Sequence, residues 1–176
     1  TSVYASFGSG GGRRTQGTKF SSDSYRLGDI DQPINFDQIV AENIASGANG
    51  ATDIFAASKN SHEWYGVLST LKTDLSETLA LSGGIDARSY VGSHWYEVTD
   101  LLGGQYFYND DLKEKTGGQA LKVGDKFNKD YDGKVGRYGL FAQLEYSKDD
   151  LSVFFSTSVS NSVYSKVDRM SYGAED

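Results

Sequence analysis

The stretch Thr78–Val91, read as Thr-Leu-Ala-Leu-Ser-Gly-Gly-Ile-Asp-Ala-Arg-Ser-Tyr-Val, decides the fold class of this chain. Alternate side chains of a β-strand point to opposite faces of its sheet. Here the odd-numbered positions are mainly apolar, whereas Ser82, Asp86 and Arg88 share the other face. A long strand with one apolar and one charged face is typical of a sheet that meets lipid on its outer side and water on its inner side.

The same alternation recurs in other parts of the chain. Near its end, Val153, Phe155 and Val159 alternate with serines. Period-two alternation of this kind predicts β-strands. The sequence therefore predicts an all-β fold with about five antiparallel strands, near residues 1–8, 63–73, 77–91, 137–147 and 151–167.

Short and very long connections alternate between these strands. Residues 9–62 and 92–136 are far longer than the usual loops of a compact domain. Outer-membrane barrels combine short periplasmic turns with long extracellular loops. We therefore interpret residues 1–176 as a partial transmembrane β-barrel domain with two extracellular loops. Because transmembrane barrels need at least about eight strands, we expect the chain to be a segment of a larger barrel.

The amino-acid composition and the net charge exclude several classes of protein. The chain has 21 Gly, 12 Tyr, one Pro and no Cys, which suits long strands with aromatic girdles and excludes disulfides and thiolate metal sites. A net charge of -7 argues against nucleic acid as a partner. No run of apolar residues is long enough for a transmembrane helix.

Several motifs then suggest a family. They are Ser61–Leu71, Gly84–Tyr90, Tyr96–Gly104, Leu121–Asp125, Gly139–Tyr146 and Ser158–Asn161. Together they resemble the barrel of TonB-dependent outer-membrane receptors, in the branch that carries a carboxypeptidase-regulatory-like domain before the plug and is related to the SusC starch-utilisation transporters.

The resemblance implies a barrel of about 22 strands around a plug, located in the bacterial outer membrane with its loops extracellular. It implies nutrient import driven by the TonB complex. The implied partners are outer-membrane lipid, the remainder of the chain's own barrel and plug, TonB through the parent protein, and a surface lipoprotein. This sequence contains neither plug nor TonB box, so energy coupling belongs to the parent receptor.

Five polar side chains are predicted to face the barrel lumen, because a charge facing lipid at mid-membrane would cost about 2–4 kcal/mol for Arg or Lys. They are Asp86, Arg88, Gln143, Glu145 and Lys166. There they can pair with one another or brace the plug. We favour this structural role over substrate contact, since ligand contacts concentrate in loops.

Aromatic clusters just outside the strands are candidates for ligand contact in the loops. They comprise His94, Trp95, Tyr96, Tyr106 and Tyr108. Aromatic rings can stack on a sugar or a peptide. Packing inside the loop or a membrane-interface girdle is the more frequent use of such residues.

One loop stretch has the spacing that begins a calcium loop. Asn128, Asp130 and Asp132 supply alternating oxygen ligands before Gly133, but the twelfth position, which should carry a carboxylate, is Gly139. The alternative is an ordinary Asp-Gly turn, joining two small strands of the loop. Apart from this calcium site, the sequence predicts no cofactor.

Two further features lie in the first predicted loop. The glycines and arginines of Gly8–Arg14 could cradle phosphate, but they lack the Gly-Lys-Ser/Thr ending and the helix of a P-loop, and a flexible rim is the alternative. The segment Pro33–Ile44 has helical spacing of apolar residues with Asn35 as its cap, which predicts a short amphipathic helix packed on the loop's own core. A partner-binding helix is the alternative.

No sequence pattern selects a nucleophile, a general acid or a metal-bound water, so we do not predict an enzyme. Two alternatives to the transporter stay open. The first is a passive porin or a surface adhesin barrel. The second is a soluble carbohydrate-binding β-sandwich, which requires Val153, Phe155 and Val159 to be buried against another sheet.

Overall fold

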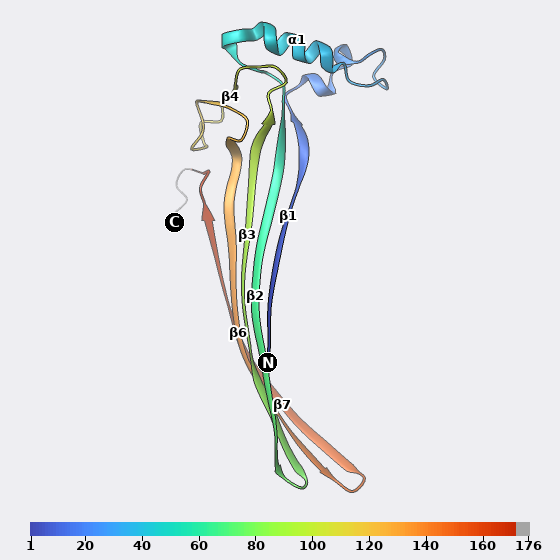
Figure 1. Cartoon of the computed structure of the whole chain (residues 1–176), viewed down its shortest axis with the longest axis vertical. Coiled ribbons are helices and arrows are strands. Elements are labelled where there is room, and N and C mark those ends of the chain that lie inside the picture. Colours follow the sequence, from blue (N-terminus) through green and yellow to red (C-terminus); the bar gives the residue numbers. More distant parts are fainter. Residues whose placement is uncertain (172–176) are drawn as a thin grey trace. The chain divides into compact units, whose positions relative to one another are not determined.

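Five long strands form a single antiparallel sheet in the computed structural model, which describes residues 1–171 (Figure 1). They lie side by side in the order β1-β2-β3-β6-β7. Their bounds are β1 Ser2–Gln16, β2 Ile54–Ser76, β3 Leu79–Asp100, β6 Lys126–Lys148 and β7 Leu151–Asp168. The predicted all-β fold with an antiparallel sheet is confirmed, and this sheet is open rather than closed on itself.

The remaining elements are short and lie in the connections. They are the 3-10 turns η1 Lys19–Ser21, η2 Asp23–Tyr25 and η3 Gly47–Asn49, the helix α1 Phe36–Ser46, and the paired strands β4 Phe107–Asn109 and β5 Gln119–Leu121. No helix of the described residues has the length and the apolar character to cross a membrane.

All five strands are longer than the sequence predicts, and the loops are correspondingly shorter. The long connections run over residues 17–53 and 101–125 instead of 9–62 and 92–136. The Gly8–Arg14 stretch belongs to β1, so it is neither a flexible rim nor a phosphate-binding loop followed by a helix. The glycines of this stretch have no side chains, so no apolar/polar alternation can be read there. They let β1 pass close to β2: a Cβ on Gly11 would lie 3.1 Å from Cγ of Lys59 on β2.

The chain divides into two compact units, which we describe separately. We call residues 1–8, 62–92 and 133–166 the strand unit, because they are stretches of the five long strands and their turns. Residues 9–61, 93–132 and, of the described residues, 167–171 form the loop unit, which contains α1, β4 and β5.

The strand unit has turns that are tighter than predicted. Residues 77–78 connect β2 with β3, and residues 149–150 connect β6 with β7. Asp149 adopts a left-handed φ of 52°, which suits a two-residue hairpin turn. Such short turns hold neighbouring strands in register and fix which side chains share a face.

The loop unit has a hydrophobic core of its own, in two clusters. The first consists of Ala51, Ile54, Ala56, Tyr96, Val98, Leu121 and Phe127. The second consists of Phe20, Ile39 and Leu102, with Phe55 and Val40 packed against it. The predicted helix is confirmed as α1: Asn35 caps it by accepting a hydrogen bond from the backbone N–H of Gln38 at 3.2 Å, and its Ile39 is fully buried.

Candidate functional site

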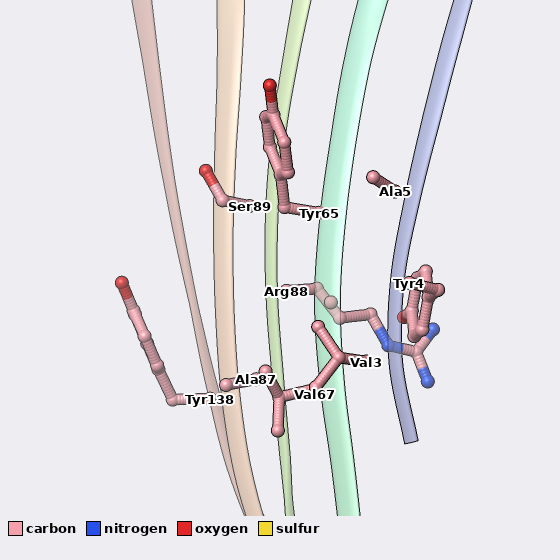
Figure 2. A pocket seen from close by; sticks show the side chains of 10 residues that line it. Val3, Tyr4, Ala5, Tyr65, Val67, Ala87, Arg88, Ser89 and Tyr138 are labelled. Carbon is pink, nitrogen blue, oxygen red and sulfur yellow. The ribbon is translucent and has the colours of Figure 1, made fainter.

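The apolar face of the strand unit is the first candidate surface. A shallow hollow of about 460 Å³ is lined there by side chains from four strands, among them Val3, Tyr65, Val67 and Tyr138 (Figure 2). A second hollow of about 420 Å³ continues the surface and includes Val159 of β7. One apolar surface therefore extends over all five strands of this unit.

The opposite face of the strand unit is polar and aromatic. The guanidinium of Arg88 donates from Nε and Nη2 to the two carboxylate oxygens of Asp86, at 2.8 and 2.7 Å. Arg88 extends across β2 towards Tyr4 (Figure 2). Gly66 makes room for that tyrosine, because a Cβ on Gly66 would collide with its ring.

A row of ring contacts follows the same polar face. The ring centroids of Tyr4 and Trp64 lie 6.4 Å apart, those of Trp64 and Tyr90 6.2 Å, and those of Tyr90 and His62 6.1 Å. Edge-to-face contacts such as the first two are a favoured geometry for aromatic pairs. These ring contacts therefore link the side chains of neighbouring strands on the polar face.

The five predicted lumen residues fall into this polar face. Besides the Asp86–Arg88 pair, Ser156 donates to Oε1 of Gln143 at 3.0 Å. Alternation along β6 and β7 places Glu145 and Lys166 on the same side. The ion pair within β3 and the hydrogen bond between β6 and β7 fit the structural role that the sequence favours.

The aromatic candidates of the loop unit do not form one binding surface. Tyr96 is only 8% exposed and packs edge-to-face on Phe127 in the core, so it is unavailable to a ligand. Trp95 donates its indole N–H to Glu97 at 2.7 Å. His94 stacks on Tyr131, with ring centroids 5.1 Å apart.

The two remaining aromatic candidates lie in the second long connection. The hydroxyl of Tyr106 donates to the backbone oxygen of Ala48 at 2.8 Å, and its ring covers Gly50. Tyr108 lies on β4 and is half exposed. Internal loop packing therefore accounts for Tyr106, whereas Tyr108 stays accessible.

The three candidate calcium ligands, Asn128, Asp130 and Asp132, lie within β6 and not in the predicted loop or in the alternative turn. Arg169 donates to both carboxylates, at 2.9 Å to Asp130 and at 2.9 and 3.0 Å to Asp132. Lys126 also pairs with Asp130, at 3.0 Å. No group of three or more metal-ligating side chains occurs in residues 1–171. The carboxylates tie β6 to the residue that follows β7.

Two buried polar residues of the loop unit, Asn43 and Asp53, were not predicted from the sequence. Asn43 donates from Nδ2 to the backbone oxygen of Asp53 at 2.7 Å and to those of Leu101 and Leu102 at 3.3 Å, and its Oδ1 accepts from Thr52 N–H. It thus fastens α1 to the start of β2 and the end of β3. Its place four residues after Ile39, on the apolar stripe of the helix, is the signal that could have revealed it.

The carboxylate of Asp53 is almost fully buried. It accepts from the backbone N–H of Lys19 at 2.8 Å and from the hydroxyl of Thr52 at 2.8 Å. A Cβ on Gly17, whose φ is +120°, would collide with this carboxylate, so glycine is required there. These contacts anchor the chain where it leaves β1.

Glu42 on α1 gathers three hydrogen-bond donors. The ammonium of Lys19 lies 2.7 Å from Oε2, the hydroxyl of Tyr25 donates to the same oxygen at 2.8 Å, and Gln38 donates to Oε1 at 3.2 Å. These hydrogen bonds lower the pKa of Glu42 to about 2, and the one from Lys19 has the largest effect. The ionised carboxylate therefore links α1 to the first two 3-10 turns.

Acid should weaken this link. The folded-state pKa of Glu42 lies below the ordinary 4.5, so its contribution to stability is complete above about pH 4.5 and is lost as the pH falls towards 2. We expect the melting temperature of the full chain to fall more steeply over this range than that of Glu42→Gln. Circular dichroism melts at half-unit pH steps measure both. Parallel declines would contradict the assignment, because other carboxyl groups titrate equally in the two proteins.

Comparison of the chain with protein-family models, with curated proteins and with solved structures finds no match. Function is therefore inferred from the two faces of the strand unit and from the loop unit.

Proposed function

We propose that this chain forms five strands of the outer-membrane barrel of a TonB-dependent receptor that imports a nutrient. The observation that carries the proposal is the apolar face of the strand unit, which nothing among the described residues covers. Val153 is 54% exposed, Phe155 70% and Val159 67%. Soluble monomers rarely expose contiguous apolar surfaces of this extent, whereas lipid covers such a face on a transmembrane strand.

The open edges of the sheet support a barrel with further strands. Each edge strand, β1 or β7, has a neighbour on one side only. An unpaired strand edge in hydrocarbon leaves backbone N–H and C=O groups without partners, at several kcal/mol each. We therefore assign the closing strands to the rest of the receptor, together with the plug and the contact with TonB.

The connections support an orientation. Two-residue turns join β2 to β3 and β6 to β7, as periplasmic turns do, whereas residues 17–53 and 101–125 fold into a packed loop unit. Loops held on a rigid scaffold usually make the ligand contacts. The loop unit then faces the outside of a bacterial outer membrane, where a surface lipoprotein can reach it.

The soluble β-sandwich is disfavoured. It requires the apolar side chains of β7 to be buried against a second sheet, and within the described residues they are exposed.

Surface labelling tests the orientation, since the chain contains no cysteine. In intact bacteria that make the receptor without other cysteines, a membrane-impermeant maleimide should label Leu112→Cys, at a side chain that is 73% exposed in the second long connection. The matched variant Asp150→Cys, in the β6–β7 turn, should react only after the outer membrane is permeabilised. Labelling of both in intact cells, or the reverse pattern, would contradict the proposed orientation.

Dependence on TonB separates the receptor from a passive porin or an adhesin. Growth on any nutrient that requires the gene for this chain should also require the gene for TonB. Growth that needs the first gene and is unaffected by loss of the second would support a porin instead.

A further inference from the structure

We propose that the loop unit contains a binding site for a small organic or inorganic oxyanion, a carboxylate or a phosphate, centred on Arg14. A polar hollow of about 330 Å³ lies between the loop-unit stretches of β1, β2 and β3. Gly12 and Arg14 line it from β1, Ser58 and Asn60 from β2, and His94 from β3. This inference does not depend on the membrane proposal.

The charge of the hollow is opposite to that of the chain. The chain has 24 acidic residues and a net charge of -7, yet no carboxylate lines the hollow. Lys59 also lines it, but its ammonium pairs with Glu97. The guanidinium of Arg14 is therefore the uncompensated charge of this site.

The sequence of β1 gives Arg14 no acidic partner on its own strand. In β3, Asp86 stands two residues before Arg88 on the same face, and the two side chains form a forked pair. The corresponding position before Arg14 is Gly12, and nothing lies within 4 Å of the place its Cβ would take. None of the ion pairs among residues 1–171 includes Arg14.

The other lining groups suit an oxyanion. A planar guanidinium binds carboxylate or phosphate through two parallel hydrogen bonds. Asn60 and Ser58 add side-chain donors, and His94 is held in place by its stack on Tyr131. The volume lies at the lower end of the range for small-molecule sites. Side chains on strands would make the contacts, unlike the backbone amides of a P-loop.

Calorimetric titration of the full chain in neutral detergent with inorganic phosphate and with citrate, at matched ionic strength in sodium chloride, tests the site. Arg14→Gln should weaken binding by about tenfold or more, because it removes a charge-assisted pair. The matched control is Arg13→Gln. Arg13 points to the opposite face, where its guanidinium lies 5.0 Å from the ring centroid of Phe55, so its loss should change affinity by less than about twofold.

A second pair of variants guards against a folding defect. Gly12→Asp should place a carboxylate where Asp86 stands relative to Arg88 and weaken binding as much as Arg14→Gln does, whereas Gly12→Ala should retain binding. Binding of phosphate alone would identify a compact phosphate group, and binding of citrate alone a carboxylate, and either supports the site. No heat from either anion at millimolar concentration, or equal losses in Arg13→Gln and Arg14→Gln, would overturn it.

Discussion

Val159→Arg should lower the free energy of unfolding of the lipid-reconstituted receptor by about 2–4 kcal/mol, the cost of an arginine facing lipid near the middle of the bilayer. Val159 lies on the apolar face and lines one of its hollows. Its side chain is 67% exposed, so the arginine meets no steric obstacle from the described residues. Any loss of stability then comes from the medium that covers this face. Denaturant titration in lipid vesicles measures it.

Ser160→Arg is the matched control. Ser160 is the next residue of β7 and lies on the polar face, beside Gly139 of β6. The same side chain there meets water and should cost less than about 1 kcal/mol, as substitutions at solvated positions usually do. Equal penalties at the two positions would contradict the assignment of lipid to one face.

Asn43→Ala should destabilise the loop unit by about 2–4 kcal/mol, as the loss of a buried hydrogen-bond network does. The substitution leaves the carbonyl groups of Asp53, Leu101 and Leu102 and the N–H of Thr52 without this partner. A buried polar group that loses its partner costs about 1–3 kcal/mol. Because Asn43 is the side chain that joins α1 to two strand ends, we expect the whole loop unit to respond.

Amide hydrogen exchange in α1 and around Ile54 reports the loss. The matched control is Asn49→Ala, the same substitution at an exposed position of η3, which should leave exchange nearly unchanged. Equal and small effects of the two variants would mean that Asn43 does not hold the loop unit together.

The strands were predictable because their signal is local. Alternation in Thr78–Val91 and in β7 follows from the geometry of a single strand and needs no knowledge of its partners. The ends of the strands were not predictable from the sequence. The glycines in Gly8–Arg14 carry no alternation of apolar and polar side chains, and the Asp-Gly pair at Asp132 is a turn motif in most contexts. Only pairing with distant strands overrides these local preferences.

The candidate sites depend more than the strands do on contacts between residues that are far apart in the sequence. The Asn35 cap was predictable from its own helix, whereas the ion pair of Asp130 with Arg169 joins β6 to the residue that follows β7 and leaves no pattern in either segment. The glycines before Arg14 suggested phosphate through a P-loop mechanism. Pairing of β1 with β2 instead brings Arg14 beside Ser58 and Asn60.

Spin labels at Val153→Cys and Ser156→Cys, measured in lipid vesicles, test most directly whether lipid covers one face of the strands and water the other. The two positions lie three residues apart on β7, so they face opposite sides. We predict that the label at position 153 is relaxed mainly by oxygen, which concentrates in lipid, and the label at position 156 mainly by a water-soluble nickel chelate. Equal accessibility of both labels to the two relaxants would contradict the account.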